Sequence, residues 1–155
     1  MNNVRGGYGF IPEELEQVRV NFLHIPEDGY VEFCIISKSA YCAITHWIAG
    51  LRKPCLIDHC RGCAIGSVKM WRFWLEVIEI ESRDKGIIEL GDRQRVWLEK
   101  ELHLNRLRGL TIRLERVFKG KNAPINIETK KTPRVESLPV ESNIEELLFR
   151  IWGIK

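Results

Sequence analysis

Residues 30–47 read YVEFCIISKSAYCAITHW, and this stretch decides the fold. Apolar side chains alternate with others from Val31 to Ile35 and again from Tyr41 to Trp47, which is the period of a strand with two different faces. The run is too long for one straight strand, so we expect a bend or bulge near residues 36–39. A long bent first strand that serves two sheets is what a small barrel needs.

The residues that follow predict the remaining elements of such a barrel. The further predicted elements are strands at 68–81, 87–90, 110–115 and 125–127 and a helix at 93–104. Five strands with a helix between the third and the fourth is the element order of an OB-fold barrel. The predicted fold class is therefore mainly β, a five-stranded OB-fold barrel.

The rest of the chain is organised around this barrel. The predicted units are an N-terminal approach segment at 1–29 with a short helix at 12–18, the OB-fold domain at 30–129, a linker at 130–142 and a C-terminal amphipathic helix at 143–155. An insertion at 46–66 separates the first two strands, and its glycines, proline and three cysteines break the strand pattern.

The apolar side chains of the C-terminal helix recur at the spacing of one helical face. These predicted partner-binding residues are Ile144, Leu147, Leu148, Ile151 and Trp152. We expect this face to dock on a protein partner. The alternatives are that it packs back on its own barrel, or on a second copy of the chain.

Composition sets the class of protein. The chain has 155 residues, of which 45% are hydrophobic and 29% charged, as in one ordinary globular domain. A wholly disordered chain, a collagen and a coiled coil are excluded. No apolar run is long enough to span a membrane, and residues 1–17 lack the apolar core of a signal peptide. We therefore expect a cytoplasmic protein.

Three cysteines and a histidine suggest a metal site in the insertion. Cys55, Cys60 and Cys63 have the spacing Cys-x4-Cys-x2-Cys, and His46 precedes them at the end of the first strand. Three thiolates and one imidazole form a closed tetrahedral site, and their softness favours a structural zinc ion. His59 is the alternative fourth ligand, although neighbouring residues rarely both reach one ion.

The other two cysteines have different expectations. Cys34 and Cys42 lie in the long β run, where we expect buried thiols. Cys42 is also a further candidate for the fourth ligand.

Basic side chains gather in two blocks that the barrel can bring together. Residues 30–74 carry six basic and two acidic groups, and residues 103–121 carry six and one. Interleaved aromatic side chains would let bases stack beside the phosphates. The predicted nucleic-acid-binding residues are Lys38, Tyr41, Trp47, Arg52, Lys53, Arg61, Lys69, Arg72, Trp74, Arg113, Arg116, Lys119 and Lys121. Trp74 is expected to point out of the barrel, whereas Trp71 shares the core phase.

The order of His46, Cys55, Cys60 and Cys63 in a predicted OB fold resembles the core of the T-even phage single-stranded DNA-binding protein family. The resemblance covers about residues 30–129 and implies a zinc-containing barrel that binds single strands in replication, recombination or mobile-element processing. The loops between the ligands are shorter here. Residues 1–29 are net acidic where that family has a basic arm, and the C-terminal helix replaces an acidic tail.

The resulting hypothesis is a protein that binds single-stranded DNA with little sequence preference. An RNA-binding OB protein is the second hypothesis, and an adaptor that recruits a partner through its C-terminal helix is the third. An enzyme is not expected, because the sequence has no phosphate-binding loop and no paired-carboxylate site. His24 and His103 have no identifiable catalytic partners.

Overall fold

The computed structural model describes residues 21–130 and 137–154. The predicted helix at 12–18 and part of the predicted linker lie outside them. The fold is mainly β, with a curled antiparallel sheet in the strand order β3-β2-β4-β1-β6-β7 and with β5 paired to β4. The strands are β1 Tyr30–Ile35, β2 Tyr41–Ile48, β3 Leu51–Pro54, β4 Met70–Glu79, β5 Lys85–Gly91, β6 Thr111–Arg116 and β7 Ile125–Thr129. The helices are α2 Arg61–Ala64, α3 Arg95–His103, α4 Ile144–Trp152 and the 3-10 helix η1 Asp92–Gln94.

The predicted bend in the long first strand is confirmed, and it divides that strand into β1 and β2. Before the bend, β1 pairs with β6 along its length and with the far end of β4. After it, β2 pairs with the first half of β4. Ser37 fixes the bend, because its Oγ accepts a 2.7 Å hydrogen bond from the backbone N–H of Glu76 on β4.

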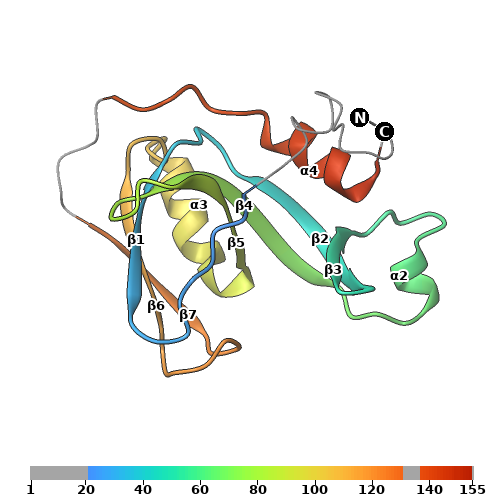
Figure 1. The fold of residues 1–155 in the computed structure, drawn as a ribbon. Helices are drawn as coiled ribbons and strands as arrows, with labels where there is room; N and C mark the ends of the chain where they lie inside the picture. The colour runs from blue at the N-terminus through green and yellow to red at the C-terminus, as the bar shows by residue number, and fades with distance from the viewer. Residues whose placement is uncertain (1–20, 131–136, 155) are drawn as a thin grey trace, which may run out of the picture.

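The sheet curls around one apolar core, with α3 inside the curl (Figure 1). Alternate side chains of β1, β4, β5 and β6 meet Leu98 of α3, as the alternation in the sequence predicts. Trp97, also on α3, donates a 2.9 Å hydrogen bond to the hydroxyl of Thr129 on β7. The helix between the third and fourth predicted strands is thereby confirmed as a core element.

The described part of the N-terminal segment packs on the barrel. Phe22 forms a parallel bridge with Ile87, and the backbone N–H of Leu23 donates to the carbonyl of Ile87 at 2.9 Å. Leu23 and Ile25 also pack against the core. Among the described strands β5 does not pair with β7, so the sheet is a half-barrel, and this segment pairs with the edge of β5.

The C-terminal helix packs on the outer face of the chain's own sheet, which was one of the alternatives (Figure 1). Ile144 and Leu148 form a second apolar cluster with Trp74 and Ile87. Trp74 does point away from the main core, but the expectation that it is exposed is wrong, since α4 leaves it only 1% accessible. The alternation of side chains along a strand predicts which face of the sheet a residue lies on. It does not predict whether another element covers that face.

A buried carboxylate anchors the segment before α4. Glu76 is 3% exposed, and both of its oxygens accept hydrogen bonds from Ser142, at 2.8 Å from the backbone N–H and 2.7 Å from the hydroxyl. The ammonium of Lys85 lies 3.5 Å from the same carboxylate. A buried charge requires such partners, so this contact fixes where the helix begins.

Within residues 21–130 and 137–154, no helix combines the length and apolar character needed to cross a bilayer.

The first prediction concerns the docking of α4. Replacing the fully buried Leu148 with alanine leaves a cavity against Trp74, so Leu148→Ala should lower the free energy of unfolding by about 2–5 kcal/mol. Chemical denaturation followed by tryptophan fluorescence measures this loss. The exposed Glu145→Gln on the same helix is the control, and equal stabilities for the two variants would contradict the packing of α4.

Candidate metal centre and the adjoining groove

The four predicted metal ligands come from the β2–β3 hairpin and the loop that follows it. His46 lies on β2, Cys55 directly follows β3, Cys60 precedes α2 and Cys63 lies within it. The hairpin turns through Ala49 and Gly50, both with positive φ (51° and 78°), as a tight two-residue turn requires. We call residues 46–67 the metal lobe, which projects from the barrel in Figure 1.

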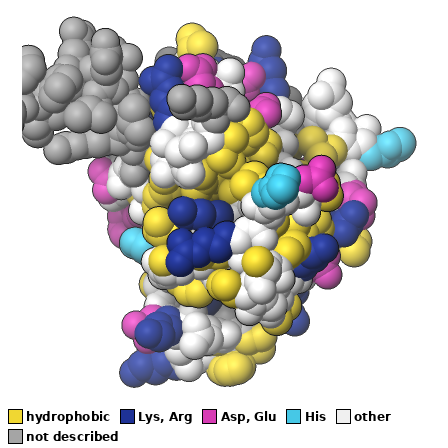
Figure 2. All heavy atoms as spheres, turned by 90° about the vertical axis from the view of Figure 1, so that its right-hand side faces the viewer, with side chains coloured by type: hydrophobic (Ala, Val, Ile, Leu, Met, Phe, Trp, Pro, Cys, Tyr) yellow, Lys and Arg dark blue, Asp and Glu magenta, His cyan; other side chains and the backbone are white. Residues whose placement is uncertain are grey.

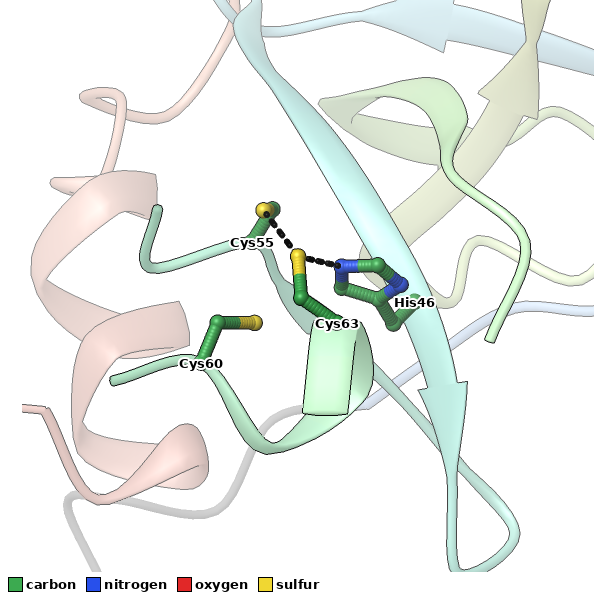
Figure 3. A group of neighbouring side chains, drawn as sticks. All are labelled: His46, Cys55, Cys60 and Cys63. Carbon is green, nitrogen blue, oxygen red and sulfur yellow. Dashed lines mark hydrogen bonds between the residues drawn. The ribbon is translucent and has the colours of Figure 1, made fainter. Parts of the chain in front are cut away.

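The ligand atoms of these residues converge on one point (Figure 3). The four atoms all lie within 4.8 Å of one another. Cys63 Sγ is 3.6 Å from Cys55 Sγ and 3.5 Å from His46 Nε2. The group could therefore hold a metal ion, and its four side chains would close around that ion.

The second nitrogen of His46 is also positioned. His46 is fully buried, and its Nδ1 lies 3.1 Å from the carbonyl oxygen of Ser67. A proton on Nδ1 would be donated to that oxygen, which leaves Nε2 with its lone pair directed at the cysteines. The ring is thus oriented with Nε2 toward the cysteines, as a metal ligand requires.

The pKa values of Cys60 and Cys63 are shifted by neighbouring groups in the cluster. Backbone N–H groups of Cys63 and Leu56 lower the pKa of the Cys60 thiol to about 6, against the opposing effect of burial. The pKa of Cys63 is raised, chiefly by its hydrogen bond with the thiol of Cys55. Three crowded sulfurs cannot all ionise without a counter-charge, which a bound cation would supply.

Gly62 makes room for the histidine. A Cβ added to this residue would lie 2.3 Å from Cγ and 2.5 Å from Cδ2 of the His46 ring. The imidazole therefore packs directly against the backbone of α2. No larger residue fits at this position unless the ligand moves.

The structure also settles the alternatives among cysteines and histidines. His59 is exposed and lies outside the cluster, whereas His46 lies within it. Cys34 is buried as expected. The expectation that Cys42 is buried is wrong: it is exposed, because β2 runs beyond the part of the sheet that the core covers.

A groove of about 1200 Å³ lies beside the metal lobe. Its floor is formed by the first residues of β4 and the last residues of β5, and its walls include the β2–β3 turn, residues 121–125 and the end of α4. Figure 2, viewed onto the end that carries the lobe, shows Lys and Arg side chains clustered beside apolar ones. Six basic and two acidic residues line the groove.

The groove brings together about half of the predicted nucleic-acid-binding residues. Those that line it are Trp47, Arg52, Lys69, Arg72, Trp74, Arg116 and Lys121. Those that do not are Lys38, Tyr41, Lys53, Arg61, Arg113 and Lys119. Tyr41 packs under α4, with its ring 6.2 Å from that of Trp152, and the guanidinium of Arg113 lies 3.5 Å from the ring centre of Tyr30.

Glu89 on β5 organises the arginines in the floor of the groove. Arg52 Nε donates a 2.8 Å hydrogen bond to the Glu89 carboxylate, while its guanidinium lies over Trp47, 5.3 Å from the ring centre. Arg72 Nε is 3.9 Å from the same carboxylate and has no hydrogen-bond partner among the described residues. Arg116 is held by the carbonyl of Ala123 at 2.8 Å.

Two aromatic residues of the groove were not assigned to it from the sequence. Trp71 lines the groove, with the guanidinium of Arg95 4.7 Å from its ring centre, although its phase matches that of the core. Trp152 lines the groove from α4, where the helical pattern pointed to a partner. Only the tertiary arrangement places these two rings at the groove.

Comparison of the chain with protein-family models, with curated proteins and with solved structures finds no match.

The metal centre gives a direct prediction. Cys60→Ser removes one of four converging ligands, so the purified variant should lose its bound metal, whereas Cys42→Ser, outside the cluster, should keep it. Elemental analysis of both proteins measures the metal per chain. Equal metal contents in the two variants would contradict the assignment.

A second prediction tests the close approach of α2 to the histidine. Alanine is the better helix former, yet Gly62→Ala should lower both metal content and thermal stability, because its methyl group would overlap the His46 ring. The exposed Arg61→Ala on the same turn is the matched control. If Gly62→Ala is as stable and as metal-rich as Arg61→Ala, the ring does not occupy this position.

Proposed function

We propose that this chain is a zinc-stabilised OB-fold protein that binds single-stranded DNA with little sequence preference. The observation that carries the proposal is the groove, in which the exposed Trp47 of β2 and several basic side chains lie beside the first residues of β4 and the last residues of β5. Outer faces of this kind, between two flanking loops, are where OB folds bind oligonucleotides.

The strand pairing supports the OB assignment. Taken together, β1 and β2 act as the first strand of such a barrel, and β4, β5, β6 and β7 follow as the second to fifth. The first strand then pairs with the second and the fourth, the second with the third, and the fourth with the fifth. In this reading β3 and α2 belong to an insertion between the first two strands.

The donor set supports zinc as the metal. Ligands at ordinary zinc distances and tetrahedral angles lie about 3.8 Å apart for two sulfurs and about 3.6 Å apart for sulfur and nitrogen. The Cys55–Cys63 sulfur pair is 3.6 Å apart and the Cys63–His46 pair 3.5 Å, and all four ligand atoms lie within 4.8 Å of one another. Three thiolates favour zinc over harder cations, and four protein ligands leave no open position for water. A bound zinc ion would cross-link the β2–β3 hairpin to the loop that follows it.

The metal lobe supports one wall of the groove. Trp47 directly follows the ligand His46, and Ser67 Oγ donates a 3.4 Å hydrogen bond to the Trp47 carbonyl while the carbonyl of Ser67 faces His46. Trp47 itself is 57% exposed. The ion would thereby hold an aromatic stacking platform in place without touching the nucleic acid.

Basic and aromatic side chains have different roles in the proposed binding of nucleic acid. The exposed residues Lys69, just before β4, and Lys121, between β6 and β7, both line the groove, where they can neutralise phosphates. Trp47 is 57% exposed and offers a ring face for bases, and stacking of this kind tolerates any sequence. Because Trp74 is covered, it serves as part of the floor under α4 rather than as a platform.

Titration with oligothymidylate tests the proposal. Tryptophan fluorescence should be strongly quenched by the single strand, weakly by a matched duplex, and binding should weaken steeply as salt rises. An oligouridylate of the same length tests RNA preference, and tighter binding to it would favour the RNA hypothesis. Absence of any response to single strands at low salt would overturn the proposal.

These two lysines give a quantitative prediction. If both contact phosphates, the double variant Lys69→Ala, Lys121→Ala should bind more weakly, and the slope of log K against log salt should fall by about 1.4. Lys100→Ala, on the exposed surface of α3, is the control. An unchanged slope in the double variant would place the phosphates elsewhere.

A further inference from the structure

The end of α4 forms part of the groove. Ile151 and Trp152 line it together with residues of β4 and β5. The same helix packs on Trp74 and Ile87, which lie further along these two strands. The outer face of β4 and β5 is thus shared: α4 covers one part, and the rest, around Arg72 and Glu89, is open as the groove floor.

Trp152 lies at the boundary between the covered and open parts. Its ring packs against Trp74 at 5.3 Å between centroids and 67° between planes, and against Phe149 at 6.3 Å. It is only partly buried by these contacts. One side of the indole is therefore held by an aromatic cluster, while the remainder is directed to the groove.

The helix is held at both ends and by the segment before it. The side chain of Asn143 accepts a 3.1 Å hydrogen bond from the backbone N–H of Glu146, and Gly153 closes the helix with φ of 71°. Ser142 is bonded to the buried Glu76, and the backbone N–H of Lys38 donates to Glu141 at 2.7 Å. These contacts make α4 a fixed wall.

We propose that α4 is part of the nucleic-acid site and that Trp152 is a stacking platform for a base at one end of the groove. This inference rests on the proposed function, because it assigns a base contact within the same groove. It gives the C-terminal helix a role in binding the strand, in place of the predicted role in recruiting a partner.

Variants of Trp152 in the full chain separate stacking from packing. Trp152→Leu keeps an apolar side chain against Trp74 but has no ring face, so affinity for labelled oligothymidylate, measured by anisotropy, should fall about 5- to 100-fold. Trp152→Phe should restore most of that affinity. Val96→Ala changes an exposed apolar residue of α3 that does not line the groove, and should bind within about twofold of the unaltered chain.

The outcomes distinguish the two proposals. If the unaltered chain fails to bind oligothymidylate, the proposed function fails. If it binds and Trp152→Leu binds equally well, only the role of Trp152 fails. Tighter binding of oligothymidylate by Trp152→Leu or by Leu148→Ala would also overturn the inference. It would mean that α4 competes with the nucleic acid for the outer face of the sheet. Thermal unfolding and metal content of each variant confirm that the fold is intact.

Discussion

The rest of the structure depends on the bend between β1 and β2. One continuous run of chain must pair with β6 on one side and with β4 on the other, and it does so by changing direction between Ile35 and Tyr41. Ser37 completes the change by accepting a hydrogen bond from β4. The bend lets the sheet curl around α3 and carries β2 beyond the core, so that the metal lobe projects beside the outer face of β4.

The stability of the metal lobe has a different origin from that of the half-barrel. This part of the chain buries little apolar surface, and Leu51, Leu56, Ile57 and Ile65 are all exposed, with Ile57 82% accessible. A loop without a core needs another source of stability, and four convergent ligands can provide it. Since His46 and Trp47 are consecutive, the ligand set and the groove wall are fixed by the same two strands. In the proposed function the metal does not touch the nucleic acid. Its loss would weaken nucleic-acid binding because Trp47 would no longer be held in place.

The sequence contains enough information for the bent strand, the core face and the ligand set. Alternation identifies Phe33 and Leu75 as core residues, and the spacing of Cys55, Cys60 and Cys63 points to one site because few other structures need three thiols in a polar loop. The short strand β3 is missed, since Arg52, Lys53 and Pro54 show no strand periodicity. Its pairing with β2 follows from the Ala49–Gly50 turn.

What the sequence does not show is which elements cover one another. The helical pattern of α4 defines an apolar face, but only the tertiary structure shows that this face lies on Trp74. The same limit applies to Leu23 and Ile25, whose packing on the barrel has no local signal. The division of the outer face into a covered part and an open groove is therefore a structural finding, and the role assigned to Trp152 depends on it.

Ultraviolet crosslinking would show where on the protein the nucleic acid binds. A bound oligothymidylate would be crosslinked to the full chain, and the modified peptides would be identified by mass spectrometry. Crosslinks are expected at Trp47, at Met70 and Trp71, and at Trp152, which line the groove. Crosslinks confined to the exposed surface of α3, around Val96 and Leu102, would contradict it.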